Sequence, residues 1–323
     1  MAEYIKKYIS ALLCTLMLWG CLGCAAATKA EDTTKSADAF TRDMGNMPTK
    51  NALKYTIKLN SGYSMPVLGL GTWTLRDENC EAAVYTAIKC GYRLIDTARY
   101  YGNEEAVGRG IKKAINEGII KREDLFVTSK IMPGDYTRPD KAIDDSLAAL
   151  GLSYIDLMLI HQPGSNDEGV YKALERGVHS GKLHSIGISN YYTPEAFERI
   201  NKIAEIVPAV VQNENHPYYQ NTMLQDYLRR YGTVVESWYP FGGRGNTDKV
   251  LKNDTIAAIA DHHGKTPAQI VLRWQIQAGY IVIPGSSNPA HIAENANVFD
   301  FELTADEMQS MKKLDKQARF ENW

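Results

Sequence analysis

The stretch Tyr154-Ile-Asp-Leu-Met-Leu-Ile-His161 decides the fold of this chain, because an apolar run of strand length ends there on an ionisable side chain. Two further apolar runs lead to polar residues in the same way: Asp96 and then Tyr101 follow residues 92–95, and Lys130 follows residues 125–129. In a closed barrel of parallel strands, the loops at the carboxyl ends of the strands surround a concave site. Ionisable side chains at that end therefore indicate chemistry, whereas polar residues at the opposite end usually serve stability.

Strand-like runs alternate with helix-like segments along the whole body of the chain, which is typical of a parallel sheet with crossover helices. About eight such units follow one another, and we therefore predict an α/β fold of the TIM (β/α)8 barrel type. The predicted strands are Gly69–Thr72, Arg93–Ile95, Leu125–Ser129, Ile155–Ile160, Ser185–Ile188, Ala209–Gln212, Val234–Ser237 and Ile281–Ile283.

An N-terminal β-hairpin is predicted ahead of the barrel. Lys54–Leu59 and Ser64–Val67 flank Asn60-Ser-Gly62, a turn sequence that contains glycine. We expect this hairpin to plug the N-terminal mouth of the barrel. Helices are predicted over Glu78–Lys89 and Asp140–Ala149, from Pro194 behind Thr193, and behind a capping box that joins Thr304 to Glu307.

The composition limits the classes of partner. The chain has 323 residues, of which 44% are hydrophobic, and a net charge of -2 at pH 7. A nucleic-acid partner would require a basic face that displaces counterions from phosphates, and the sequence has no Lys/Arg cluster to form one. We therefore expect no nucleic-acid partner, a small-molecule substrate, and a monomer. Cys80 and Cys90 would lie about 15 Å apart on a helix, too far for a disulfide, so both are expected to be free thiols.

Residues 1–24 have the pattern of a bacterial export signal. Two lysines precede an apolar run over Ile9–Trp19, which is shorter than the roughly 20 residues that span a bilayer. The run ends at Gly20-Cys-Leu-Gly-Cys24 and resembles a lipobox, in which Cys21 or Cys24 would carry the lipid.

Residues 25–54 lack helical or strand periodicity and are expected to form a flexible tether in front of a barrel domain at residues 55–323. The barrel would then lie in the cell envelope, lipid-anchored or periplasmic, and would contact the membrane only through its N-terminal anchor. The alternative is a cytoplasmic protein in which the signal is not used.

Three motifs resemble signatures of the aldo-keto reductase family, and in particular its bacterial members of the 2,5-diketogluconate reductase type. They are Gly91-Tyr-Arg-Leu-Ile-Asp-Thr-Ala-Arg-Tyr-Tyr-Gly-Asn-Glu104, Thr128-Ser-Lys130 and Leu159-Ile-His-Gln-Pro163, and the resemblance covers about residues 55–323. It implies NAD(P)H-dependent reduction of aldehydes or ketones to alcohols. The family's catalytic tetrad falls on Asp96, Tyr101, Lys130 and His161, where the spacing Ala-x-x-Tyr-x-Asn-Glu selects Tyr101 over Tyr100.

The tetrad implies a division of labour, because the cofactor supplies only the hydride and the protein must supply the proton. Tyr101 would be the proton donor, and the Lys130 ammonium would lower the pKa of its phenol from about 10. Asp96 would keep Lys130 charged, since an unpaired buried ammonium tends to lose its proton. His161 would donate a hydrogen bond to the carbonyl oxygen and stabilise the negative charge that develops there.

The nicotinamide end of the cofactor site is implied by two further segments. No Gly-x-Gly-x-x-Gly follows a strand at the start of the barrel, which argues against a Rossmann-type site. The resemblance places contacts to the nicotinamide carboxamide on Ser189, Asn190 and Gln212. Trp238 falls where an aromatic side chain stacks on the nicotinamide ring.

The adenosine-phosphate end of the cofactor site corresponds to residues 281–295. Its cofactor-binding candidates are Ser286, His291, Glu294 and Asn295. The family's Lys and Arg, which hold the 2′-phosphate of NADPH, are replaced here by Gly285 and His291. We expect NADPH as the cofactor, with NADH use left open.

The substrate mouth is expected to include Trp73, Gln162 and Trp323. In the family the residue before the proline of the Leu159–Pro163 motif is often Trp, so Gln162 indicates a wetter pocket. Such a pocket suits polar carbonyl compounds, such as sugar-derived or keto-acid compounds, or small aldehydes.

Two other functions fit parts of the sequence. A metal-dependent hydrolase on the same barrel would use His161, His216, His262 and His263. No His-x-His pair ends a strand, however, and no metal site is expected. A non-catalytic barrel that binds or senses NAD(P)H is the second alternative, and the intact tetrad argues against it.

Overall fold

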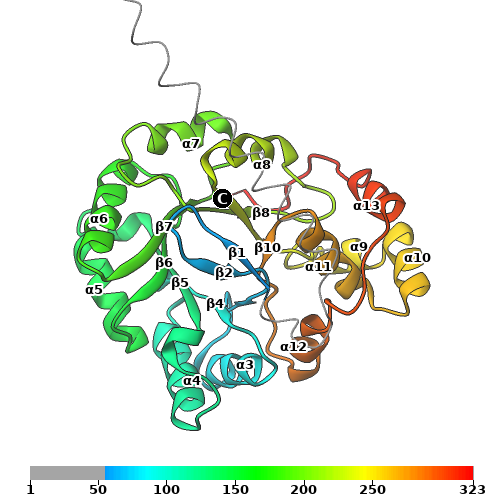
Figure 1. The fold of residues 1–323 in the computed structure, drawn as a ribbon, viewed down its shortest axis with the longest axis horizontal. Coiled ribbons are helices and arrows are strands. Elements are labelled where there is room, and N and C mark those ends of the chain that lie inside the picture. Colours follow the sequence, from blue (N-terminus) through cyan, green and yellow to red (C-terminus); the bar gives the residue numbers. More distant parts are fainter. Residues whose placement is uncertain (1–54, 323) are drawn as a thin grey trace, which may run out of the picture.

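The computed structural model describes residues 55–322 (Figure 1). The predicted export signal at 1–24, the tether at 25–54, the lipidation candidates Cys21 and Cys24, and the substrate-mouth candidate Trp323 lie outside the described residues. Between residues 55 and 322, no helix combines the length and the apolar character that a membrane span requires.

Eight parallel strands form the barrel, and each strand pairs with its neighbours in chain order. A parallel bridge between Leu68 and Val282 joins the first strand region to the last and closes the sheet. This arrangement confirms the predicted (β/α)8 barrel. The strands are β3 (Leu70–Gly71), β4 (Leu94–Asp96), β5 (Phe126–Ile131), β6 (Ile155–Ile160), β7 (Leu183–Ser189), β8 (Val210–Glu214), β9 (Val234–Trp238) and β10 (Ile281–Val282).

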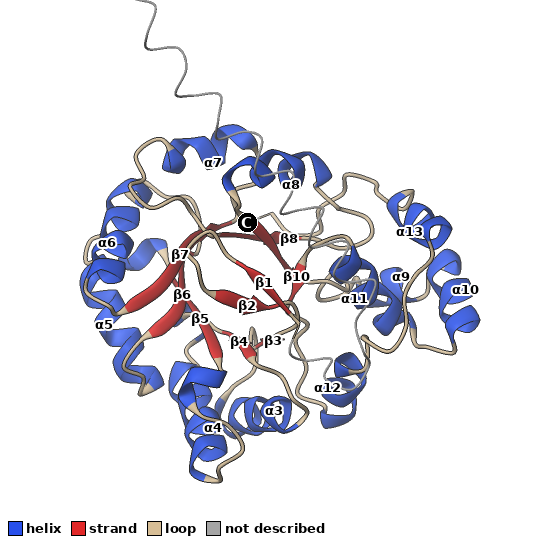
Figure 2. Cartoon of the chain, viewed as in Figure 1, coloured by secondary structure: helices blue, strands red, loops and turns tan. Residues whose placement is uncertain are grey.

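Helices surround the ring of strands (Figures 1 and 2). They are α3 (Asp77–Lys89), α4 (Glu104–Asn116), α5 (Pro139–Leu150), α6 (Asp167–His179), α7 (Pro194–Asn201), α8 (Thr222–Leu228), α9 (Thr247–Leu251), α10 (Asp254–His263), α11 (Pro267–Gln277), α12 (Pro289–Ala296) and α13 (Ala305–Lys312). The side chain of Thr193 accepts a hydrogen bond from the third residue of α7, and Thr304 forms the predicted capping box with Glu307 at the start of α13.

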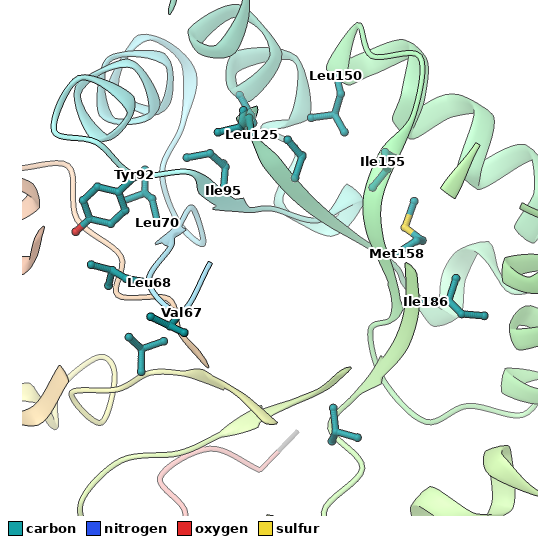
Figure 3. Close-up of a cluster of buried hydrophobic side chains, with 14 of the residues drawn as sticks. Val67, Leu68, Leu70, Tyr92, Ile95, Leu125, Leu150, Ile155, Met158 and Ile186 are labelled. Carbon is teal, nitrogen blue, oxygen red and sulfur yellow. The ribbon is translucent and has the colours of Figure 1, made fainter. Parts of the chain in front are cut away.

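The strands are rich in apolar residues because both of their faces are buried, although polar side chains such as Lys130 and Glu236 are buried within them. Leu157 and Leu159 of β6 belong to the cluster inside the barrel, whereas Met158 and Ile160 belong to the cluster between the barrel and its helices. Figure 3 shows part of this outer cluster, with Met158 and Ile186 on neighbouring strands. Burial of each such side chain contributes about 1.5–3 kcal/mol, so the apolar runs that identified the strands also stabilise the barrel.

The hairpin of β1 (Thr56–Lys58) and β2 (Ser64–Pro66) lies across the middle of the ring of strands, as predicted (Figure 2). Leu59 and Met65 extend the apolar cluster inside the barrel. At the turn, the Ser61 hydroxyl lies 2.8 Å from the Ser185 hydroxyl near the start of β7. Because the hairpin occupies the amino ends of the strands, their carboxyl ends remain available for a site.

The two cysteines of the barrel, Cys80 and Cys90, are both free thiols, as expected. Cys80 is fully buried on α3, and this burial raises the pKa of its thiol to about 11. A thiol that stays protonated is a poor nucleophile, so Cys80 is part of the core and not a reactive group.

Candidate active site

The four predicted catalytic residues meet at the carboxyl ends of neighbouring strands. Asp96 ends β4, Lys130 lies near the end of β5, and His161 follows β6 directly. Tyr101 comes from the 3-10 turn Arg99–Tyr101 that follows β4. Lys130 Nζ lies 2.7 Å from Asp96 Oδ1, 3.0 Å from the Thr97 carbonyl oxygen and 3.2 Å from the Tyr101 hydroxyl. An ammonium group has three N–H donors, and these three acceptors use all of them.

The structure distinguishes Tyr101 from its neighbour Tyr100. Tyr101 is 9% exposed and its hydroxyl contacts Lys130, whereas Tyr100 is 54% exposed and stacks on Trp73 with ring centroids 5.8 Å apart. The motif spacing and the geometry therefore select the same tyrosine. Tyr100 instead forms part of the outer wall of the cavity.

The ion pair between Lys130 and Asp96 is almost completely buried, with exposed side-chain fractions of 0% and 2%. Burial alone would lower the pKa of Lys130, but the Asp96 carboxylate outweighs it and the pKa of Lys130 is raised. Lys130 is therefore a permanent cation beside Tyr101. This agrees with the expected role of Asp96 as a counter-ion.

The net effect on Tyr101 differs from the expectation that Lys130 lowers its pKa. Burial raises the pKa of the Tyr101 phenol to about 12, and the Lys130 ammonium opposes this rise only in part. The expected net lowering is therefore wrong, because the loss of hydration of the phenolate outweighs the neighbouring cation. Tyr101 stays protonated at neutral pH and is ready to act as an acid. An alkoxide is a much stronger base than a phenolate, so it can still take this proton.

His161 is a neutral imidazole in this site. Burial lowers the pKa of His161 well below its ordinary value, and the charge of Lys130 lowers it further. Its Nδ1 atom is buried and has no hydrogen-bond partner among residues 55–322. A buried N–H without an acceptor is costly, so this favours the tautomer with the proton on Nε2. That proton can be donated to a ligand in the cavity, which His161 lines.

A cavity of about 540 Å³ opens above these residues. Its lining includes eleven of the predicted site residues: Trp73, Asp96, Tyr101, His161, Gln162, Ser189, Asn190, Gln212, Trp238, Ser286 and His291. Lys130 lies beneath the lining, in contact with Asp96 and Tyr101. The cavity therefore brings together the predicted catalytic residues and most of the predicted cofactor contacts.

Other lining residues were missed by the sequence reasoning. They include Met132, Tyr239, Phe241, Arg244 and Asn288. Three of them belong to the loop after β9, in which Gly242, Gly243 and Gly245 all have positive φ angles. A glycine-rich loop directly after a predicted barrel strand is the signal that could have identified this wall.

The polar groups on one side of the cavity fit a carboxamide. Gln212 Nε2 donates to Asp96 Oδ2 at 2.8 Å and to Glu236 Oε2 at 2.6 Å, so both of its N–H groups are used by carboxyl groups. The side-chain oxygen of Gln212 is then the atom that can accept a bond from a ligand. Ser189 Oγ accepts a long bond of 3.3 Å from Asn190 and keeps its own proton for donation. The Ser189 hydroxyl can donate to the oxygen of a nicotinamide carboxamide, and the Gln212 oxygen can accept from its NH₂ group.

Asn190 stabilises the carboxamide side of the cavity, because its polar side-chain atoms bond to neighbouring residues. Its Nδ2 donates to the His161 carbonyl oxygen at 2.8 Å, and its Oδ1 accepts from the Tyr192 hydroxyl at 3.0 Å. The backbone of Asn190 is left-handed, with φ of 67°. Trp238, half-buried at the end of β9, presents an aromatic surface to the same cavity, as stacking on a flat ring requires.

The adenosine-phosphate candidates divide into two groups. Ser286 and His291 line the cavity, whereas Glu294 and Asn295 on α12 do not. The Glu294 carboxylate accepts a hydrogen bond from Thr266 Oγ1 at 2.7 Å, at the start of α11. A Cβ on residue 285 would lie 3.0 Å from the Gly71 carbonyl oxygen, so Gly285 allows this close approach of two backbone segments.

The histidines named for a metal-dependent hydrolase do not meet in one place. His161 lines the cavity, and His216 is buried against the Glu214 carboxylate at 3.0 Å. His262 and His263 both contact Glu307, at 2.8 and 3.0 Å, and this group alone among the described residues has spacing that suits a metal ion. It lies away from the cavity lining, so the hydrolase hypothesis has no support at the site.

The fold and the cavity together define a (β/α)8 barrel protein with a buried tyrosine, lysine and aspartate cluster at the base of a cavity of about 540 Å³. The chain belongs to the Aldo/keto reductase family, whose model matches residues 67–316. It is an NAD(P)H-dependent enzyme that reduces aldehydes or ketones to alcohols, and the non-catalytic alternative is not favoured.

Several relatives resemble the chain over most of its length. The NAD(P)H-dependent D-xylose reductase I,II of Candida tropicalis is 41% identical over 304 residues, which cover 82% of this chain and 94% of the relative. An aldo-keto reductase of Mycobacterium sp. (strain MCS) is 41% identical over 271 residues, with 82% and 92% covered. The crystal structure of an aldo-keto reductase enzyme from a Medee basin deep-sea metagenome library has a TM-score of 0.79 and 39% identity, and the match covers 83% of this chain and 97% of that one.

Proposed function

We propose that this protein reduces polar carbonyl compounds of the sugar-derived or keto-acid type, with Tyr101 as the proton donor. The role of Tyr101 rests on the buried contacts from Asp96 through Lys130 to the Tyr101 hydroxyl, of 2.7 and 3.2 Å, and the polar substrate class rests on Gln162 in the cavity lining. When bound, the cofactor supplies the hydride. Aldoses are supported as substrates by the D-xylose reductase relatives, and 2,5-diketogluconate by the motif resemblance.

The proposal gives each residue of the site a separate role. Ser189 and Gln212 would hold the carboxamide of a bound cofactor, and Trp238 would offer an aromatic surface to its nicotinamide ring. The Nε2–H of His161 binds the substrate carbonyl oxygen and orients it toward Tyr101. Tyr101 gives up its hydroxyl proton to that oxygen, and the ammonium of Lys130 stabilises the phenolate that remains. Trp73, Tyr100 and Gln162 line the entrance and limit the access of water.

Initial-rate measurements test the substrate class. Purified residues 55–323 would be assayed with D-xylose, 2,5-diketogluconate, a short keto acid and an apolar aromatic aldehyde, each with NADPH and with NADH. We expect higher kcat/KM for the polar compounds. Turnover of the apolar aldehyde alone would contradict the proposed substrate class without affecting the assignment of the reaction.

We further propose that the chain is exported as a lipoprotein and acts as a monomer in the cell envelope. The support is the sequence pattern at residues 1–24, with Cys21 or Cys24 as the lipidated residue. Export separates the enzyme from the cytoplasmic pool of NADPH, so the proposal requires tightly held nucleotide. Mass spectrometry of the mature protein from its source would give the N-terminal residue, any lipid, and any bound nucleotide. An intact Met1 on protein from the soluble fraction would contradict export.

A further inference from the structure

Glu236 is a buried acid of the active site that lies outside the tetrad. It occupies the middle of β9, where it is 0% exposed and pairs in register with Gln212 of β8. Gln212 Nε2 donates to Glu236 Oε2 at 2.6 Å and to Asp96 Oδ2 at 2.8 Å. A single amide nitrogen therefore bridges two carboxyl groups, one of which is the counter-ion of Lys130.

The two carboxyl groups differ in what neutralises them. Asp96 has the Lys130 ammonium at 2.7 Å, whereas the one group that residues 55–322 place within hydrogen-bond distance of Glu236 is the shared amide. The second oxygen of Glu236, Oε1, is buried and has no partner within the described part of the chain. A charged carboxylate buried in this way is costly, so the bound proton belongs on Glu236.

The charged and titratable groups that face Glu236 also favour a proton on its carboxyl group. They are Asp96 from β4 and Lys130 from β5, while the paired residue on β10 is the apolar Ile281. Burial raises the pKa of Glu236 to about 8, and the charge of Asp96 raises it while Gln212 and Lys130 oppose. Glu236 is therefore a neutral acid at neutral pH and a carboxylate in alkaline solution.

We propose that Glu236 is a positioning residue for the proton donor: in alkaline solution its ionisation adds a second negative charge to the buried cluster around Lys130, and this charge adds to the burial that holds Tyr101 in its protonated, donating form. The inference rests on the proposed role of Tyr101. The effect follows from electrostatics, because a negative charge that is added near an acid disfavours loss of its proton. Reduction, which needs the phenol, is then maintained at higher pH than a cluster without Glu236 would allow.

The first test is the pH profile of Glu236→Gln. Because Glu236 also holds the Gln212 amide, kcat/KM of each enzyme is normalised to its own value at about pH 6, and the two enzymes are compared by the position of the alkaline limb. The alkaline limb should move to lower pH by about one unit, because the charge that holds the proton on Tyr101 is gone. Ser237→Ala is the matched control, since Ser237 Oγ is also buried on β9 and has no partner among residues 55–322. The alkaline limb of the Ser237→Ala profile should lie at the same pH as in wild type. Superimposable profiles of Glu236→Gln and wild type would overturn the proposal.

The second test needs no turnover. Infrared difference spectra of the wild-type protein should show the carbonyl stretch of a protonated carboxylic acid that disappears on titration with a midpoint near 8. The band should be absent from Glu236→Gln and present in Tyr101→Phe. Absence of the band from wild type, or its persistence in Glu236→Gln, would overturn the inference. A chain that reduces no carbonyl compound still gives this spectrum, so failure of the proposed function is distinguished from failure of the inference.

A conservative variant covers the case in which Glu236→Gln does not fold. Glu236→Asp keeps an ionisable group on β9, and we expect it to retain both the titrating infrared band and the wild-type alkaline limb. The variant could instead keep the titrating band while its alkaline limb moves to lower pH. This result would show that ionisation at residue 236 does not control Tyr101, and it would overturn the proposal.

Discussion

Replacement of Lys130 by Met removes the cation that neutralises Asp96 in a fully buried site. Asp96 is 2% exposed and, of its donors among the described residues, would keep the Gln212 amide at 2.8 Å. Breaking a buried ion pair from one side costs about 3–5 kcal/mol, because an uncompensated charge remains. At roughly 2–4 °C per kcal/mol for a domain of this size, we expect the Tm of Lys130→Met to fall by about 6–20 °C at pH 7.

The loss of Tm in Lys130→Met should grow as the pH rises. Burial raises the folded-state pKa of Asp96 above its unfolded value even beside Lys130, which opposes the rise, so loss of Lys130 should raise this pKa further. A group with a raised folded pKa contributes most stability below its unfolded pKa and loses that contribution as the pH rises. The Tm of Lys130→Met, relative to wild type, should therefore fall from about pH 4 upward. Scanning calorimetry at several pH values measures this trend.

The double variant Lys130→Met with Asp96→Asn is the control that separates charge from packing. It removes both charges, so most of the lost stability at pH 7 should return, although activity should not. Equal Tm values for the single and the double variant, or a penalty in the single variant that does not vary with pH, would refute the reasoning that Lys130 and Asp96 form a charged pair.

Three further predictions concern the acid, the cofactor and the core. Tyr101→Phe should lower kcat by about 10²–10⁴-fold and leave the Kd for NADPH, measured by fluorescence, within about twofold; an active variant would exclude Tyr101 as the donor. His291→Arg should raise the preference for NADPH over NADH by about tenfold in kcat/KM, since a guanidinium binds a phosphate dianion and His291 lines the cavity. Leu159→Ala, inside the barrel, should cost about 2–5 kcal/mol in urea unfolding, and a loss below about 1 kcal/mol would contradict its core position.

The fold was predictable because burial on both faces of a parallel strand leaves a mostly apolar run. The predicted strand Ile155–Ile160 has the same bounds in the structure. β7 begins at Leu183, two residues before the predicted start, where Leu183 pairs with Ile155 of β6, and His184 there stacks on Tyr63 and Tyr154 with ring centroids 4.5 and 4.1 Å apart. A contact of this kind joins distant segments, and no local pattern in the sequence indicates it.

The meeting of Asp96, Tyr101, Lys130 and His161 at one end of the barrel was predictable from motif spacing, but the electrostatics of this cluster were not. The effect of Lys130 on Tyr101 has the expected sign, and the net pKa of Tyr101 still rises because the phenol is deeply buried. Glu236 was missed for a related reason. A glutamate in a strand is assumed to face water, and only the register of β8 against β9 shows that it faces Asp96 and Gln212.

Gln212 connects the two halves of the site, and this constrains how the site can vary. Its amide nitrogen is held by Asp96 and Glu236, so its oxygen is the atom that a nicotinamide carboxamide meets. The orientation of the cofactor therefore depends on two carboxyl groups that also set the charge around Tyr101. Replacing Glu236 by an apolar residue would free one N–H of Gln212 and allow its amide to rotate. Such a change should weaken both NADPH binding and proton donation, whereas Glu236→Gln, which retains an acceptor, should affect the proton alone.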